Sequence, residues 1–261
     1  MKNALFVIDP QNDFCENTGS LYVPGATGDM TRLALFLKNN AANIHNIILT
    51  ADDHQPNDIS HPAFWRGKDG KQPAPFITIT VKDVENKTFV PADGNVDRAV
   101  DYLQCLENEG RYSHTIWPVH CLSGTYGAEI CKTLMDAVLE WAQQPGKYYS
   151  IVRKGAYPFT EHFGAFKAEV PNPDFPETMF NYKLADELNK FDTIYLAGEA
   201  KSHCVANTIS QLFDTVPQLV SKLVILEDAM GCVAGFEHAA DNVYQIAKER
   251  GAKFADTSIT I

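Results

Sequence analysis

Short hydrophobic runs alternate along the chain with longer segments of helical periodicity. Apolar runs rich in β-branched residues predict strands over residues 4–8, 47–50, 76–81, 149–152, 193–197 and 223–226. Apolar residues recurring at every third or fourth position predict helices over residues 31–38, 96–106, 127–142, 205–212 and 235–248. Strands that alternate with helices favour an α/β fold with a mostly parallel sheet buried on both faces.

Polar residues gather where the predicted strands end. Asp9 follows the first strand, Asp52 and His54 follow the second, and Lys154 and the segment 198–204 follow two later strands. In open α/β sheets the ligand lies beyond the carboxyl ends of the strands. The sequence therefore predicts a functional site at this edge of the sheet. Neither a glycine-rich dinucleotide motif nor a P-loop motif is present.

The segment from Gly198 to Cys204 begins with glycine after a strand and continues into an amphipathic helix. Cys204 would lie at a helix N-terminus, where the dipole and the N–H groups favour a thiolate and can form an oxyanion hole. On this segment alone, Cys204 is either a nucleophile or a buried packing residue. Asp9 could act as a general base and Lys154 could support charged states, although each alone would be read as a turn residue or a surface lysine.

A second group of polar residues has the composition of a metal site. Asp52 and His54 are two positions apart, and such residues point the same way in an extended chain. His61 and His120 follow further along the sequence. One carboxylate and up to three imidazoles would suit a divalent transition metal that keeps open positions for water or substrate. Any one of these histidines alone would more often be structural.

Composition and charge narrow the class of protein. The chain has 261 residues, 45% hydrophobic and 21% charged, which suits a single globular domain over residues 1–261. Its 22 Lys and Arg against 33 Asp and Glu give a formal net charge of −11, which argues against nucleic acid as a partner. No apolar stretch reaches the length of a signal-peptide core or a membrane span. We therefore expect a cytoplasmic protein without a membrane partner, in which the six cysteines are mostly reduced.

The segment over residues 62–116 is long and mixed in character. It combines a stretch rich in glycine and lysine with a strand-like and a helix-like pattern, so it predicts a structured insertion rather than a linker. Such an insertion could form a lid, an oligomer contact or a wall of the pocket. We expect the protein to assemble as a homo-oligomer.

Five short motifs occur in a fixed order along nearly the whole chain. They are Asp9-Pro10-Gln11-Asn12-Asp13-Phe14, Asp52-x-His54 with His61, Trp117-Pro118-x-His120-Cys121, Lys154-Gly155-Ala156-Tyr157 and the turn from Gly198 to Cys204. In this combination the chain resembles the nicotinamidase branch of the isochorismatase-like cysteine hydrolases. The Asp, Lys and Cys motifs are shared by all branches, whereas the Asp-x-His and Trp-Pro-x-His-Cys elements point to the nicotinamidases.

The resemblance implies a three-layer α/β/α fold with a doubly wound sheet, and an enzyme that converts nicotinamide to nicotinic acid and ammonia. It gives Cys204 the role of nucleophile, Asp9 that of general base and Lys154 that of third triad member. The N–H groups of Ala200 and Cys204 would form the oxyanion hole. A cis peptide is implied at the bond between residue 199 and Ala200.

The resemblance also assigns a metal site and a ring-binding site. It implies that a zinc, iron or manganese ion orients the pyridine ring and is held by Asp52, His54, His61 and His120. Phe14 and Trp117 match positions that pack against the ring.

Some residues depart from the pattern of the family. Asp53 replaces the usual aromatic residue, which leaves open which aspartate binds the metal, and Glu199, Lys201 and Ser202 place charged and polar groups near the thiol. The same cysteine chemistry on another small carboxamide or carbamoyl substrate is one alternative. A non-catalytic binding protein on this fold is another, although the filled triad positions argue against it.

Overall fold

A six-stranded sheet forms the centre of the molecule in the computed structural model, which describes residues 1–109 and 113–261. Every strand pair in this sheet is parallel. The strand order is β5-β2-β1-β6-β7-β8, with bounds β1 (Asn3–Ile8), β2 (Ile44–Asp52), β5 (Tyr149–Lys154), β6 (Thr193–Gly198), β7 (Leu223–Leu226) and β8 (Lys253–Ala255). The predicted α/β fold with a parallel sheet is confirmed.

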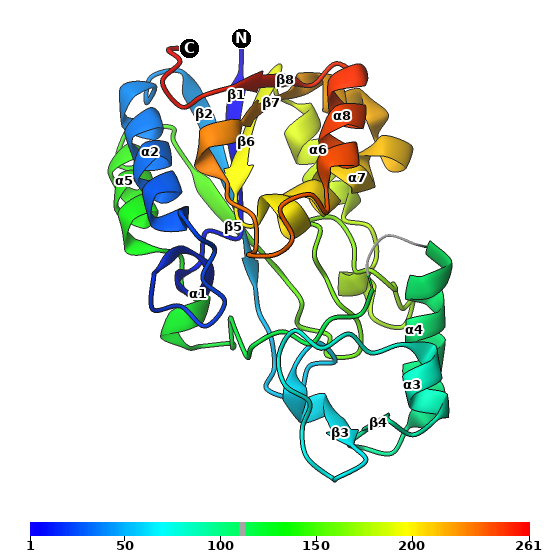
Figure 1. Ribbon diagram of the computed structural model, residues 1–261. Helices are drawn as coiled ribbons and strands as arrows, with labels where there is room; N and C mark the ends of the chain where they lie inside the picture. The colour runs from blue at the N-terminus through cyan, green and yellow to red at the C-terminus, as the bar shows by residue number, and fades with distance from the viewer. Residues whose placement is uncertain (110–112) are drawn as a thin grey trace.

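Helices cover both faces of the sheet because its central strands are apolar on both sides (Figure 1). Leu5 and Val7 of β1 pack in one core with α2 (Ala26–Asn39) and α5 (Lys132–Ala142). The alternate residues Ala4, Phe6 and Ile8 pack in a second core on the opposite face. The helices of that face are α6 (Tyr182–Asn189), α7 (Ala206–Thr215) and α8 (Asp241–Glu249).

Short helical turns connect the larger elements. Helix α1 (Asn12–Cys15) directly follows β1, and the π-helical turn η4 (Lys201–Val205) joins β6 to α7. The remaining turns are η2 (Tyr126–Ala128), η3 (Pro176–Thr178), η5 (Pro217–Lys222) and η6 (Glu227–Ala229). Within the described parts of the chain, no helix has both the length and the hydrophobicity needed to cross a membrane.

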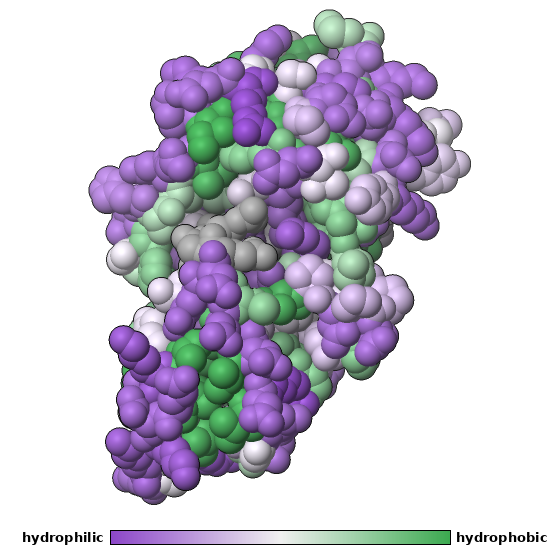
Figure 2. Space-filling model, turned by 90° about the vertical axis from the view of Figure 1, so that its right-hand side faces the viewer, coloured by the Kyte–Doolittle hydropathy of each residue, from purple (hydrophilic) through white to green (hydrophobic). Residues whose placement is uncertain are grey.

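Between β2 and β5 the chain builds a subregion with its own apolar core. It contains η1 (Pro62–Phe64), β3 (Trp65–Gly67), α3 (Val81–Glu85), β4 (Phe89–Pro91) and α4 (Val96–Glu109), and β3 pairs with β4 in antiparallel fashion. Figure 2 shows hydrophobic side chains at the surface in the lower part of the molecule, where this subregion lies. Residues 110–112 of the insertion predicted over 62–116 lie outside the described residues.

One predicted strand is wrong. Residues 76–81 do not form a strand: Thr78 makes an isolated bridge to Thr115, and Val81 begins α3. The physical reason is a capping box, in which Thr80 and Asp83 satisfy each other's backbone N–H groups and start a helix. Ile79 and Val81, which suggested alternation, are buried in the core of the insertion rather than on a sheet.

Candidate active site

Three side chains from separate strand ends meet beyond the carboxyl edge of the sheet. Asp9 directly follows β1, Lys154 ends β5, and Cys204 lies in the turn after β6. Lys154 Nζ lies 2.9 Å from Asp9 Oδ2. The Cys204 sulfur and one carboxylate oxygen each from Asp9 and Asp52 lie within 4.8 Å of one another. The three residues predicted to form a triad therefore share one buried cluster.

The protonation states in this cluster are set by burial. Burial raises the pKa of Asp9 to about 6, against the opposing charge of Lys154 and a hydrogen bond from Thr50. Burial also raises the pKa of the Cys204 thiol, and the neighbouring Asp9 carboxylate adds to this. Desolvation outweighs the attraction of Lys154 and favours the protonated thiol, in the direction opposite to the helix dipole. Two carboxylates raise the pKa of Lys154 although its burial opposes this, so it remains charged.

A second cluster lies beside the triad. One ligand atom each from Asp52, His54 and His120 lies within 4.8 Å of the others, and all three residues are buried. The His54 and His120 ring centroids are 4.8 Å apart. His61 packs against both rings, but its Nε2 faces His120 Nδ1 at 3.3 Å and its Nδ1 faces the Gln55 carbonyl oxygen at 3.0 Å. The structure thus groups three of the four predicted ligands, and the role of His61 stays a prediction.

The surrounding groups suit this cluster to a cation. His120 Nδ1 donates to the Pro118 carbonyl oxygen at 2.8 Å, which leaves Nε2 as the ligand atom. Burial lowers the pKa of His120 to about 3, so its imidazole is neutral. The pKa of His54 is raised, despite burial, because Asp58 and Asp52 flank its ring. These two carboxylates favour a positive charge at the His54 ring. A metal ion bound there would supply such a charge in place of the ring's proton.

The structure distinguishes the two adjacent aspartates. Asp52 faces His54, with Oδ2 at 3.7 Å from Nε2, and its other oxygen accepts a hydrogen bond from Lys154. Asp53 instead faces Arg153, 3.9 Å away, outside the cluster. Asp53, which replaces the usual aromatic residue, therefore does not disturb the group formed by Asp52, His54 and His120.

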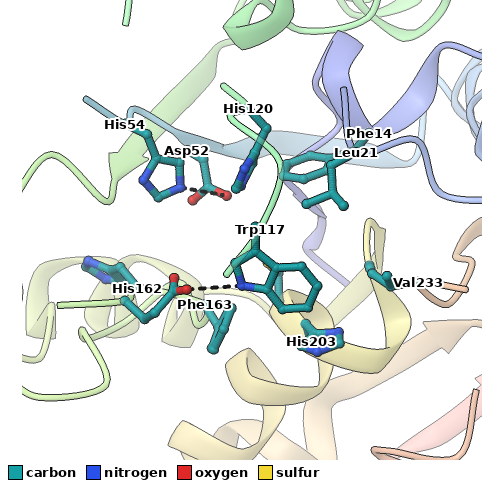
Figure 3. A pocket seen from close by; sticks show the side chains of 13 residues that line it. Phe14, Leu21, Asp52, His54, Trp117, His120, His162, Phe163, His203 and Val233 are labelled. Carbon is teal, nitrogen blue, oxygen red and sulfur yellow. Dashed lines mark hydrogen bonds and ion pairs between the residues drawn. The ribbon is translucent and has the colours of Figure 1, made fainter. Parts of the chain in front are cut away.

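A pocket joins the triad to the histidine cluster. Its lining residues are Phe14, Leu21, Asp52, His54, Trp117, His120, Glu161, His162, Phe163, Ala200, His203, Cys204 and Val233. In Figure 3, Asp52, His54 and His120 lie on one side of the pocket and Trp117 lies across from them. The predicted ring-packing residues Phe14 and Trp117 both line this pocket, which could hold a flat aromatic ring.

The turn that carries the nucleophile also lines the pocket. Ala200 and Cys204 are both lining residues. The peptide between Glu199 and Ala200 is cis, as the resemblance implies. The oxyanion hole formed by the two N–H groups stays a prediction.

Among the site residues that were not found from the sequence, two position predicted ones. Asp58 Oδ2 lies 3.0 Å from His54 Nδ1, while Asp58 Oδ1 accepts hydrogen bonds from Ser60. Glu161 accepts a hydrogen bond from the Trp117 indole N–H at 3.1 Å, and burial raises its pKa well above the usual range. The spacing of four residues between His54 and Asp58 is the one sequence signal that could have suggested Asp58. No sequence pattern points to Glu161, because it lies in an irregular loop.

Comparisons with known proteins agree with the fold and with the resemblance to the nicotinamidases. No family model matches the chain. A curated nicotinamidase from Saccharomyces cerevisiae is 28% identical over 205 residues, which is 78% of this chain and 78% of that protein.

Two solved structures share the fold. One is the yeast nicotinamidase bound to the inhibitor nicotinaldehyde, with a TM-score of 0.66 and 22% identity over 97% of this chain and 99% of that one. The other is a pyrazinamidase of Pyrococcus horikoshii in complex with zinc, with a TM-score of 0.57 and 20% identity over 98% and 99%. The chain therefore has the fold of the isochorismatase-like hydrolases and resembles the nicotinamidases among them.

Proposed function

We propose that this protein is a metal-dependent amidase that hydrolyses nicotinamide to nicotinic acid and ammonia through a thioester on Cys204. One observation carries the proposal: Cys204, which shares a buried cluster with Asp9 and Lys154, lines the same pocket as Asp52, His54 and His120. A nucleophile next to a base, with an aromatic-walled pocket alongside, is the arrangement that acyl transfer requires. The nicotinamidase relative supports the choice of substrate.

The acylation half of the reaction follows from the position of the Cys204 thiol beside the Asp9 carboxylate. Asp9 takes the proton of Cys204, and the sulfur attacks the carboxamide carbon. The oxyanion that forms is stabilised by the N–H groups of Ala200 and Cys204. Asp9 then returns the proton to the amide nitrogen, the C–N bond breaks and ammonia leaves.

The deacylation half uses the same groups. Asp9 is again a carboxylate after ammonia has left, so it can take a proton from water as the water oxygen attacks the thioester carbonyl. The C–S bond breaks, the acid is released and Cys204 recovers its proton. Lys154, charged and 2.9 Å from Asp9, stabilises the carboxylate form that both half-reactions need.

Asp52, His54 and His120 would hold a divalent metal, with His61 as the further predicted ligand. When bound, the ion would supply a Lewis acid for the pyridine nitrogen and so orient the ring. Imidazole and carboxylate ligands suit zinc first, with iron or manganese as alternatives, and the Pyrococcus horikoshii relative is in complex with zinc. Phe14 and Trp117 would pack against the ring and direct its carboxamide toward Cys204.

Ammonia release from a panel of small carboxamides, with and without a chelator, tests the proposal. We expect nicotinamide turnover that is lost on chelation and returns when zinc, iron or manganese is added. Turnover of other carboxamides or of carbamoyl compounds that ignores the chelator would favour the alternative substrate class. No turnover of any compound by the metal-loaded protein would contradict an amidase.

Two further properties of the protein are its location in the cell and its oligomeric state. We infer a cytoplasmic location, supported by six cysteines that are all free in the described residues. The homo-oligomer expected from the sequence stays a prediction, which sedimentation at several protein concentrations would test.

A further inference from the structure

Two cysteines outside the triad lie together on the α1 and α5 side of the molecule. Cys15 ends α1, and Cys131 immediately precedes α5. Both line one surface groove, together with Glu16, Asn17, Thr27, Met30, Lys132 and Thr133. Both residues are buried, with relative exposures of 2% for Cys15 and 4% for Cys131. The proposed amide hydrolysis uses neither of them.

Backbone pairing brings the two residues together. Gln11 forms an antiparallel bridge with Ile130, and the Cys131 N–H donates to the Pro10 carbonyl oxygen at 2.8 Å. The Cys15 N–H donates to the Gln11 carbonyl oxygen at 2.9 Å, which places Cys15 one helical turn beyond that bridge. The Cys15 and Cys131 thiols then lie close enough for a hydrogen bond between them to shift the pKa of both.

The two thiols of this pair are not equivalent. The hydrogen bond from Cys15 lowers the pKa of Cys131, and the Leu134 N–H in the first turn of α5 adds to this, while burial opposes both. The same hydrogen bond, together with burial, raises the pKa of Cys15. Cys121 and Cys204 differ, because burial raises the pKa of each. The pair thus combines an attacking thiol with a resolving thiol.

We propose that Cys15 and Cys131 form a thiol–disulfide exchange site, which a small disulfide of the glutathione type converts into an intramolecular disulfide. The Cys131 thiolate attacks one sulfur of the reagent, forming a mixed disulfide and releasing one small thiolate. The Cys15 thiol loses its proton to solvent and attacks the Cys131 sulfur, releasing the second small thiolate. Both protein sulfurs are oxidised, and the reagent is reduced to two thiols.

The test uses a background in which the two more accessible thiols are removed by the Cys105→Ser and Cys232→Ser substitutions. This protein is incubated with glutathione disulfide, and its intact mass and peptide map are measured. We expect the loss of two hydrogen atoms and a single bridge between the Cys15 and Cys131 peptides. Adding Cys121→Ser, a matched buried thiol, should leave the bridge unchanged.

Single substitutions in that background identify the attacking sulfur. Cys15→Ser should retain one glutathionyl group on Cys131, because no resolving thiol remains. Cys131→Ser should give neither the bridge nor a glutathionyl group on Cys15. A background protein that shows no bridge, or a bridge through Cys121, would overturn the proposal. The peptide map of the background protein tests the proposed exchange site even if a single-substitution variant fails to fold. It does not depend on amidase activity.

Discussion

The thiol of Cys204 is the group that forms and breaks bonds in the proposed reaction. Cys204→Ala should lower kcat by about four orders of magnitude or more, because no thioester can form. The metal content should not change, since the sulfur is not in the group formed by Asp52, His54 and His120. Ammonia release and metal analysis on the same preparation measure both effects. Cys232→Ala is the matched control, and full activity of Cys204→Ala would contradict the mechanism.

The raised pKa of Asp9 predicts the acid limb of the pH profile. Asp9 must be ionised to accept the thiol proton, and its pKa is about 6. The value of kcat/KM should therefore fall about tenfold per pH unit below that point. A profile that stays flat well below pH 6 would contradict Asp9 as the base.

Protonation of Asp9 should lower the activity at acid pH without destabilising the folded protein. Because its pKa in the folded state is raised, protonation of Asp9 favours folding. Its contribution to stability is fully present below the ordinary value of 3.8 and is lost as the pH rises through about 6. Circular dichroism across the same pH range separates the loss of activity from the loss of structure.

At the residue scale, the sequence predicted the groups to which the proposed reaction assigns chemistry, and it missed two residues that position their neighbours. Asp9, Lys154 and Cys204 stand at strand ends, and an α/β sheet brings such ends together. Asp58 and Glu161 act only through contacts with His54 and Trp117 across space. Such contacts depend on how loops fold, so periodicity carries no signal for them.

Among the elements, the loop after β2 positions His54, one of the predicted metal ligands. Asp58→Asn removes the charge that holds the His54 ring, and it should weaken metal affinity by about 10–100-fold. Competition with a coloured chelator measures this affinity. Asp53→Asn is the control, because Asp53 faces Arg153 and should leave the affinity unchanged. Equal losses in both variants would indicate a general charge effect and contradict a positioning role.

Strand β6 reaches the nucleophile turn through Gly198, which has a φ of +119°. A Cβ atom at this position would lie 2.1 Å from the Ile8 carbonyl oxygen of the neighbouring strand. Gly198→Ala should therefore lower the free energy of unfolding by about 2–6 kcal/mol, from backbone strain and steric overlap together.

Gly146→Ala is the matched control for this substitution. Gly146 also has a positive φ, but nothing lies within 4 Å of the added Cβ. Only the backbone penalty of about 1–3 kcal/mol should remain. Urea unfolding measures both variants, and a loss at Gly198 no larger than that at Gly146 would contradict the steric argument.

Strands were predicted most accurately where both of their faces are buried. Strands β1 and β7 are fully buried and were predicted nearly to their ends. Strand β8 has three residues, exposed to half-buried, and no apolar run marks it. Residues 76–81 misled because local capping by Thr80 outweighed their alternation. Pairing with β7 therefore decides β8, whereas a local cap decides residues 76–81.

In the whole molecule, the chain order explains where the site lies. From β1 the chain moves to β2 and then to β5 on one side, and it later returns to β6 on the other side. The connections diverge beside β1, which is the switch point where open α/β sheets bind ligands. Asp9 and Cys204 flank this point. The single domain over residues 1–261 stays a prediction, since the insertion has an apolar core of its own.

The separate apolar core of the insertion allows this part of the protein to unfold locally. The loop that carries His61 and the segment that carries Trp117 are tied to the insertion: the Trp65 indole N–H donates to the Ile59 carbonyl oxygen at 2.7 Å, and the Trp117 N–H donates to the Ser60 carbonyl oxygen at 2.8 Å. We expect the insertion to exchange its amide hydrogens as one cooperative unit, faster than the central sheet. Hydrogen–deuterium exchange followed by mass spectrometry measures this, and uniform exchange across insertion and sheet would contradict it.

Transient unfolding of the insertion would loosen one wall of the pocket while β1 and β6 keep Asp9 and Cys204 in place. A local unfolding equilibrium would then control the entry of substrate.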